Sequence, residues 1–220
     1  MSSDIHQPWT HTTGSRVQTT PAVVDGIVYI GSGDKKVYAL DAATGTPRWS
    51  HTTGSSFWSR LDHSVLSSPA VVDGMVYIGS GDNRVYALDA ATGTPRWSHT
   101  TGSSFWSRLD HSVLSSPAVV DGMVYVGSGD NRVYALDAAT GTPRWSHTTG
   151  GWVRSSPAVV DGTVYVGSGD NRVYALDAAT GSPRWSHTTG GWVRSSPAVV
   201  DGTVYVGSGD NRVYALDAAT

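Results

Sequence analysis

One segment, PAVVDG, recurs five times along the chain, and its spacing limits the fold more than any other feature. Its proline falls at Pro21, Pro69, Pro117, Pro157 and Pro197, so successive copies are 48, 48, 40 and 40 residues apart. A period in the forties is typical of a propeller blade or of a paired-helix repeat. The chain is therefore an array of near-identical units, and side-chain periodicity has to separate the two architectures.

The residues within each unit favour strands. Valine and tyrosine alternate in TVYVGSG and RVYALDA, and no segment keeps an apolar stripe at i, i+3, i+4 and i+7 long enough for a packed helix. In the fourth copy we expect strands over 155–161, 163–168, 172–178 and 183–189. The first two are joined by Asp161–Gly162, and Asp-Gly between apolar runs is a strong hairpin signal.

Four antiparallel strands per unit predict an all-β fold, a five-bladed β-propeller of four-stranded antiparallel blades. We expect a single domain over 1–220, with repeats starting near 21, 69, 117, 157 and 197. The fifth unit lacks its fourth strand, and PWTHTTGSRVQTTP at 8–21 aligns without gaps to RWSHTTGGWVRSSP at 184–197. Residues 7–14 are therefore predicted to supply the outer strand of the blade begun at 197 and to close the ring.

Ring closure also bears on the number of chains. A ring closed within one chain favours a monomer. Because the units are nearly identical, their edges are interchangeable, and a strand-swapped oligomer is the alternative.

Composition excludes several classes of function. With 15 Lys+Arg against 18 Asp+Glu, the net charge of −3 gives no broad attraction to nucleic acid or to an anionic membrane. The absence of cysteine excludes disulfides, thiol nucleophiles and Cys-ligated metals. The first residues, MSSDIHQPWTHTTG, lack the basic and apolar regions of a signal peptide, so we expect a cytoplasmic protein if Met1 is the native start.

A longer motif follows the third predicted strand of each unit. ALDAATGTPRW stands at 39–49, 87–97 and 135–145, and ALDAATGSPRW at 175–185. The motif resembles the tryptophan-docking motif of the PQQ-like, quinoprotein-type β-propellers, and the resemblance covers essentially the whole chain. It implies that the tryptophan packs flat against the neighbouring blade, while Asp and Thr-Gly hold the turn before the outer strand. The structural tryptophans are then Trp9, Trp49, Trp97, Trp145 and Trp185.

The resemblance does not extend to the catalytic members of that family. Quinoprotein dehydrogenases use a calcium-bound quinone and, in many members, a vicinal cysteine pair. This chain has no cysteine and no unique acidic residue that breaks the symmetry of the units. We therefore expect no cofactor and no metal site, and a protein that is not an enzyme.

Repetition points in the same direction, because a catalytic centre needs different groups in different roles around one substrate. Near-identical blades offer only rings of the same group, so we assign no catalytic residue. The SHTT or THTT histidines, at His11, His51, His99, His147 and His187, are expected on outer strands, far apart at the rim. GSGDNR is interpreted as a hairpin turn, since it lacks the context of a phosphate-binding loop.

Variation between the units is concentrated in the connections from each outer strand to the next unit. Four of the five carry Trp-x-Arg, and tryptophan and arginine are the residues most often found as binding hot spots. Propeller topology places these connections on one face, with the turns between second and third strands. The candidate binding residues are Trp58, Arg60, Trp106, Arg108, Trp152, Arg154, Trp192 and Arg194.

Three hypotheses of function follow. The first is a non-catalytic scaffold or binding propeller that holds an unknown protein, peptide or polymer ligand at the Trp-x-Arg face. The second is a recently amplified or engineered repeat propeller with no ligand of its own, in which each Trp covers a blade junction and its Arg stacks on it. The third, a quinone-dependent dehydrogenase, is disfavoured by the residues above.

Overall fold

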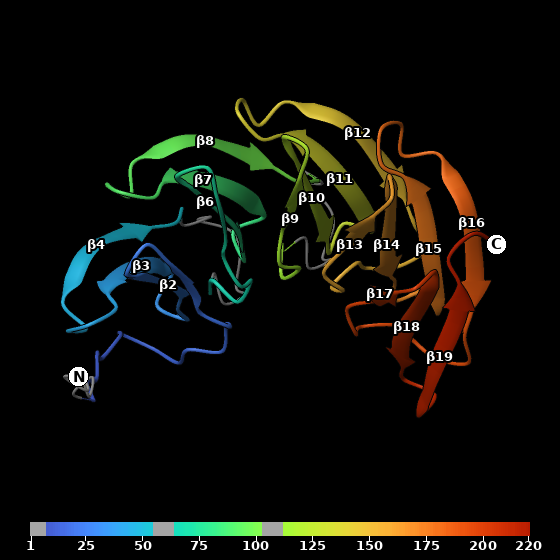
Figure 1. Cartoon of the computed structure of the whole chain (residues 1–220), viewed down its shortest axis with the longest axis horizontal. Helices are drawn as coiled ribbons and strands as arrows, with labels where there is room; N and C mark the ends of the chain where they lie inside the picture. Colours follow the sequence, from blue (N-terminus) through green and yellow to red (C-terminus); the bar gives the residue numbers. More distant parts are fainter. Residues whose placement is uncertain (1–7, 55–63, 103–111) are drawn as a thin grey trace, which may run out of the picture.

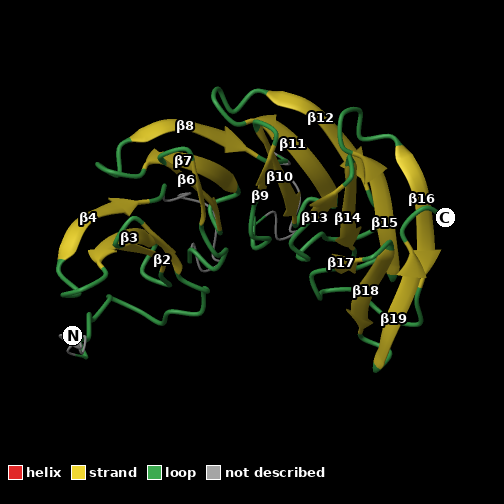
Figure 2. Cartoon of the chain, viewed as in Figure 1, coloured by secondary structure: helices red, strands yellow, loops and turns green. Residues whose placement is uncertain are grey.

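A computed structural model describes residues 8–54, 64–102 and 112–220, and all regular structure within these ranges is β-strand (Figure 2). Over the same ranges, no helix is long and apolar enough to pass through a membrane. The strands form five antiparallel sheets, numbered here blade 1 to blade 5 in chain order (Figure 1).

The bounds of the strands repeat from blade to blade. Blade 1 contains β1 (Ala22–Val24), β2 (Ile27–Gly31), β3 (Lys36–Asp41) and β4 (Pro47–Thr52). Blade 2 contains β5 (Ala70–Val72), β6 (Met75–Ser80), β7 (Arg84–Asp89) and β8 (Pro95–Thr100). Blade 3 contains β9 (Ala118–Val120), β10 (Met123–Ser128), β11 (Arg132–Asp137) and β12 (Pro143–Thr148). Blade 4 contains β13 (Ala158–Val160), β14 (Thr163–Gly167), β15 (Arg172–Asp177) and β16 (Pro183–Thr188), and blade 5 contains β17 (Ala198–Val200), β18 (Thr203–Ser208) and β19 (Arg212–Asp217).

The turn between the first two strands of each blade is the predicted Asp-Gly hairpin. In blade 1, Asp25 has a φ of 48° and Gly26 a φ of 71°. Two successive positive φ angles define the type I′ turn, whose twist matches that of the flanking strands, and Asp-Gly is a preferred pair there. The prediction of a hairpin from Asp-Gly is confirmed.

A second left-handed position lies just before the third strand. Asn83, Asn131, Asn171 and Asn211 occupy it with φ between 68° and 70°. Asparagine accepts this conformation more readily than most residues. In blade 1 the position holds Lys35, with a φ of 71°, so the same backbone is built there with a less suitable side chain.

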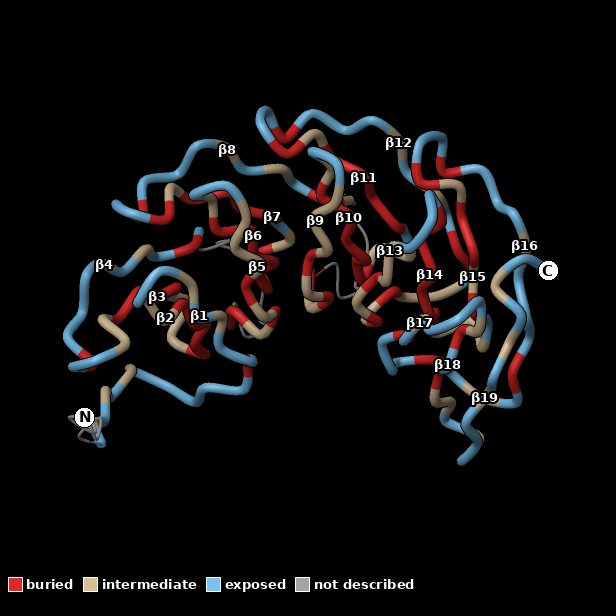
Figure 3. Tube along the Cα trace, viewed as in Figure 1, coloured by how far each residue is buried: buried red, intermediate tan, exposed pale blue. Residues whose placement is uncertain are grey.

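Each blade lies with its first strand innermost and its fourth strand at the rim. β1 contacts β5, β5 contacts β9, β9 contacts β13 and β13 contacts β17, so the first strands line the inner side of the molecule. The core lies between blades: Tyr77 and Val85 of blade 2 pack with Val113, Val124 and Val126. Figure 3 shows this burial along the second and third strands, with the rim strands largely exposed.

The predicted fold class is confirmed, with five antiparallel sheets and four strands in each of blades 1 to 4. Blade 5 differs from the prediction, because within the described ranges its sheet contains only β17, β18 and β19. The expected outer strand over 7–14 is not paired with β19: the described part of it, 8–14, has no strand assignment. Figure 1 shows an open arc with the two termini at opposite ends.

The N-terminal segment contacts blade 1, and the free edge of β19 lies at the other end of the arc. The indole of Trp9 donates to the carbonyl oxygen of Ala42 at 3.0 Å, and the backbone N–H of Gly14 donates to Asp34 at 2.8 Å. The segment is therefore held on blade 1. Because the four blade junctions repeat one set of contacts, they repeat one rotation, and five blades at that rotation leave the ring open (Figure 1).

Candidate binding surface

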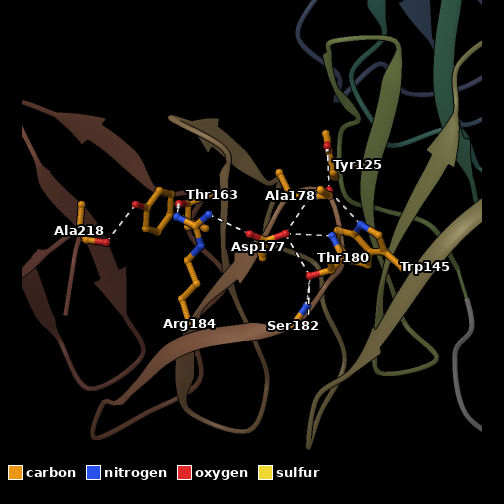
Figure 4. Close-up of polar contacts among 11 residues, drawn as sticks. Tyr125, Trp145, Thr163, Asp177, Ala178, Thr180, Ser182, Arg184 and Ala218 are labelled. Atoms are coloured by element: carbon orange, nitrogen blue, oxygen red, sulfur yellow. Dashed lines mark hydrogen bonds and ion pairs between the residues drawn. The ribbon is translucent and has the colours of Figure 1, made fainter.

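The docking motif forms every junction between blades. In blade 3, the indole N–H of Trp145 donates to the carbonyl oxygen of Ala178 in blade 4 at 2.9 Å (Figure 4). The hydroxyl of Tyr125 donates to the same oxygen at 3.1 Å, so one carbonyl of the next blade accepts two bonds. Trp49, Trp97 and Trp185 donate in the same way to Ala90, Ala138 and Ala218. The five tryptophans assigned a structural role all lie against the following blade.

The aspartate of the motif organises the turn that presents this carbonyl. Asp177 accepts from the backbone N–H and the hydroxyl of Thr180, and Arg184 pairs with it at 2.9 Å (Figure 4). The Arg184 guanidinium, followed by the bonds from Thr180, lowers the pKa of Asp177 to about 2. The carboxylate therefore stays charged at neutral pH and fixes the turn that carries Ala178.

Two Trp-x-Arg connections are described: one joins β12 to β13 and carries Trp152, and the other joins β16 to β17 and carries Trp192. Both lie on the face that carries the turns between the second and third strands of the blades. The backbone N–H of Gly169 donates to the carbonyl of Trp152 at 2.8 Å, and Gly209 repeats this bond to Trp192. A Cβ at Gly169 would lie 2.5 Å from the Trp152 ring, so glycine is needed for the indole to lie over the turn. The topology expected for this face holds for both connections.

The four described candidate side chains form one continuous stack. The guanidinium of Arg194 lies 5.0 Å from the ring centroid of Trp152 and 5.1 Å from that of Trp192. The guanidinium of Arg154 lies 5.1 Å from the ring centroid of Trp152. The two indole centroids are 6.4 Å apart. These distances are within the range of cation–π attraction, so two arginines and two tryptophans form one cluster on the surface joining blades 4 and 5.

Exposure differs along the stack. Trp192 is 46% exposed and Arg194 is also exposed, whereas Trp152 and Arg154 are half-buried. The valine between them, Val153 or Val193, is fully buried and anchors the connection in the junction below. Trp58, Arg60, Trp106 and Arg108 lie outside the described residues.

The histidines of the outer strands contribute to the junctions. His147 lies 5.7 Å from the ring of Tyr174 in the next blade, and the other four repeat this contact at 5.5 to 5.8 Å. Burial lowers the pKa of His147. Each histidine therefore packs within a separate blade junction, as expected from its position on an outer strand.

Sequence reasoning missed a groove on the opposite face. It has a volume of about 1480 Å³ and is lined by the Asp-Gly turns and the docking-motif turns of successive blades. Six aspartates and three arginines line it, and the arginines Arg96, Arg144 and Arg184 pair with Asp89, Asp137 and Asp177. The repeated Asp-Gly and Asp-Ala-Ala-Thr-Gly turns, which lie at the same end of blades 1 to 4, were the signal that could have found it.

The sequence matches the family model described as outer membrane protein assembly factor BamB over residues 6–149 and 149–220. None of the curated proteins compared with it matches.

Among solved structures, the chain is similar to BamB from Moraxella catarrhalis, with 23% identity and a TM-score of 0.77 over 96% of this chain and 61% of that one. It is also similar to the computationally designed Ika8 protein, with 21% identity and a TM-score of 0.75 over 90% of this chain and 57% of that one. It is similar, too, to a quinohemoprotein alcohol dehydrogenase from Pseudomonas putida, with 23% identity and a TM-score of 0.76 over 95% of this chain and 41% of that one.

The chain thus spans less than two thirds of the length of each of these structures. The likeness supports the propeller fold and does not by itself select an activity, since an assembly factor, a designed protein and a dehydrogenase share it. The motif, the junctions and the family match agree, and the chain belongs to the PQQ-like repeat family whose model is described as outer membrane protein assembly factor BamB.

Proposed function

We propose that this chain is a non-catalytic binding propeller that holds a protein, peptide or polymer ligand on the stack formed by Trp152, Arg154, Trp192 and Arg194. The observation that carries the proposal is the contact of Arg194 with two indoles, 5.0 Å and 5.1 Å from their centroids. A guanidinium that packs against indole rings can still direct N–H donors away from them, where they can pair with a carboxylate. The stack thus offers flat apolar faces and oriented positive charge together.

Two further observations support this reading. The arginines on the outer rim are engaged by their own blade, as Arg48 is by Asp41 at 2.7 Å. Arg194, in contrast, makes its described contacts with aromatic rings on an exposed face. The description of the family as an assembly factor supports a protein partner over a small molecule. The repetition of identical groups from blade to blade supports a binding role over catalysis.

Arg194→Ala tests the proposal, with Arg132→Ala as the matched control, because Arg132 is also exposed and makes no contact with an indole among the described residues. The probe is a peptide of alternating Glu and Tyr, titrated against the tryptophan fluorescence of the protein. Removing a partly desolvated charged hydrogen bond costs about 1.5–3 kcal/mol, so R194A should bind the peptide at least about tenfold more weakly. R132A should bind within about twofold of the parent.

The alternative, a repeat propeller with no ligand of its own, makes the opposite prediction. The parent, R194A and R132A would then all fail to bind the peptide or bind it equally weakly. Thermal unfolding of the three proteins is measured alongside, because R194A must keep its fold for the comparison to count.

A further inference from the structure

The two ends of the arc expose side chains that every internal junction buries. In blade 5, Val213 is 79% exposed, whereas its counterparts Val37, Val85, Val133 and Val173 are fully buried. Tyr205 is 45% exposed, and its counterparts Tyr29, Tyr77, Tyr125 and Tyr165 are at most 4% exposed. At the other end, Val17 is 47% exposed, while Val65, Val113, Val153 and Val193 are fully buried. Both ends therefore carry one half of a blade junction.

The N-terminal segment already occupies the place of an outer strand from a preceding blade. Its contacts with blade 1 match those of β16 or β12 with the blade that follows. Trp9 bonds to Ala42 as Trp145 bonds to Ala178. His11 lies 5.5 Å from Tyr38, and the N–H of Gly14 donates to Asp34 as that of Gly150 donates to Asp170. The segment therefore makes the contacts of an outer strand with the following blade, but it is not paired with a third strand of its own.

We propose that copies of this 220-residue chain associate head to tail, with residues 8–14 of a second copy adding to the free edge of β19. In blade 4, Val173 is opposite His187 and Ala175 is opposite Trp185. The same register places Val213 opposite His11 and Ala215 opposite Trp9 of the second copy. The added strand completes blade 5 and brings blade 1 of the second copy against it as a further blade.

The proposed junction would give the carbonyl of Ala42 the second hydrogen-bond donor that the equivalent carbonyls have at the internal junctions. Each internal docking carbonyl accepts from a tryptophan and a tyrosine, whereas Ala42 accepts from Trp9 alone among the described residues. In the head-to-tail contact the hydroxyl of Tyr205 supplies the second bond to Ala42 of the other copy. Burial of Tyr205, Val213 and Val17 accompanies it, and apolar burial is the main driving force of association.

A ladder along the inner strands also extends through the junction. The N–H of Thr20 donates to the hydroxyl of Ser68, and the ladder continues through Ser116 and Ser156 to Ser196 at distances of 2.8 to 3.1 Å. At the first residue of the ladder it is the N–H of Thr20 that takes part, and at the last it is the hydroxyl of Ser196. A further step of the same kind would use the N–H of Ser196 and the hydroxyl of Thr20. Joining Ser196 to Thr20 of the second copy repeats the same step once more.

A second copy fits these ends better than closure within one chain. The junctions repeat nearly the same bonds, with indole-to-carbonyl distances of 2.9 to 3.0 Å, so they hold the blades at one rotation, and the arc stays open (Figure 1). Closing one chain would require every junction to change that rotation. A second copy continues the existing geometry, and such a heterologous contact repeats until the ring closes or a filament forms. Trp192 then takes the half-buried position that Trp152 has now, and the stack stays on its face.

The mass of the protein in solution is the first test. Light scattering coupled to size exclusion should give at least twice the chain mass of 23.2 kDa, with more assembly at higher concentration. A monodisperse 23.2 kDa species at all concentrations would overturn the proposal.

Cysteine pairing tests the register, since the chain has no cysteine of its own. Arg212 and Thr12 are exposed, and the register derived from Arg172 opposite Thr188 makes them neighbours across the new contact. Chains with only R212C, mixed with chains with only T12C, should form a disulfide-linked dimer. A mixture of R172C and T12C is the control and should not, because β15 is already paired with β16. If a chain with both R212C and T12C gives only an internally linked monomer, the ring closes within one chain and the proposal fails.

A charge at the contact provides a second variant. Val213→Arg places a guanidinium where a buried junction is expected and should weaken association at least about tenfold, since a buried unpaired charge is costly. Thr100→Arg, on an exposed outer strand, is the control and should associate like the parent. Circular dichroism establishes that both variants keep their strands. Equal association of the two variants would contradict the proposed contact.

Discussion

The indole nitrogen of Trp145 lies 2.9 Å from the carbonyl oxygen of Ala178, and this bond joins the rim of blade 3 to the turn of blade 4. The carbonyl belongs to a turn held by Asp177, whose partners are Thr180 and Arg184 (Figure 4). One 11-residue motif thus supplies both halves of a junction. Its tryptophan donates to a carbonyl of the following blade, and its aspartate holds the turn whose carbonyl accepts from the tryptophan of the preceding blade. Repetition of the motif is therefore sufficient to repeat the junction.

Trp145→Ala should destabilise the protein by about 3–5 kcal/mol, because it removes a large aromatic side chain from a junction and leaves a void. Trp145→Phe keeps a ring but loses the bond to Ala178 and should cost less. Chemical denaturation measures both. Arg144→Ala is the control on the same strand: it breaks an exposed ion pair with Asp137 and should cost no more than about 1 kcal/mol. Equal losses for W145A and R144A would show that the tryptophan does not hold the junction.

Lys35→Asn should stabilise the protein. Lys35 has a φ of 71°, and a left-handed conformation costs a non-glycine residue about 1–2 kcal/mol, less for asparagine. The other four blades already place asparagine there with nearly the same φ. We expect a gain of about 0.5–1 kcal/mol in the free energy of unfolding. The reciprocal change, Asn171→Lys, should lose a similar amount, and a gain from both substitutions would contradict this explanation.

Much of this molecule could be predicted from sequence because its information is local and repeated. The Asp-Gly turns fixed the first hairpins, and the Val and Tyr alternation identified the strands. The docking tryptophans were found because the repeated ALDAATGTPRW segment resembles the docking motif of the PQQ-like propellers. The alignment of 8–21 with 184–197 identified the docking contacts that the N-terminal segment makes with blade 1, although the segment is not a strand in the structure.

The closure of the ring was beyond this reasoning, for a physical reason. Pairing of 7–14 with β19 depends on the rotation between blades, which is the sum of small angles set by side chains such as Tyr125 and Trp145. No local pattern encodes that sum. The contact of Arg194 with two indoles could not be predicted either, because it joins connections that are 40 residues apart.

Gly181→Ala should cost more than Gly122→Ala, although both glycines have a positive φ, 72° and 71°. A Cβ at Gly181 would meet the Trp145 ring at 2.6 Å, whereas nothing lies within 4 Å of a Cβ at Gly122. Both substitutions place alanine in a left-handed backbone conformation, which costs about 1–2 kcal/mol at either position. The difference in unfolding free energy therefore isolates the contact with the indole, and it should disappear when both changes are made in a W145A background. A difference that persists there would mean that the ring is not its cause.

The protein should lose stability in alkali through a set of tyrosines at the junctions. Burial, followed by the hydrogen bond to Asp130, raises the pKa of Tyr134 to about 12. Tyr38, Tyr86 and Tyr174 are raised to about 12 in the same way. A pKa raised above the unfolded value of 10.0 gives stability that is complete below pH 10 and is lost as the pH rises toward 12.

The melting temperature should therefore be insensitive to these groups up to about pH 10 and should then fall, in step with the appearance of tyrosinate absorbance. Tyr134→Phe is the informative variant. It removes the bond to Asp130, made at 2.5 Å in the parent, so its melting temperature should be lower at neutral pH. Because one titrating group is gone, the further fall between pH 10 and 12 should be shallower than in the parent. Parallel curves for Y134F and the parent would show that Tyr134 does not titrate with folding.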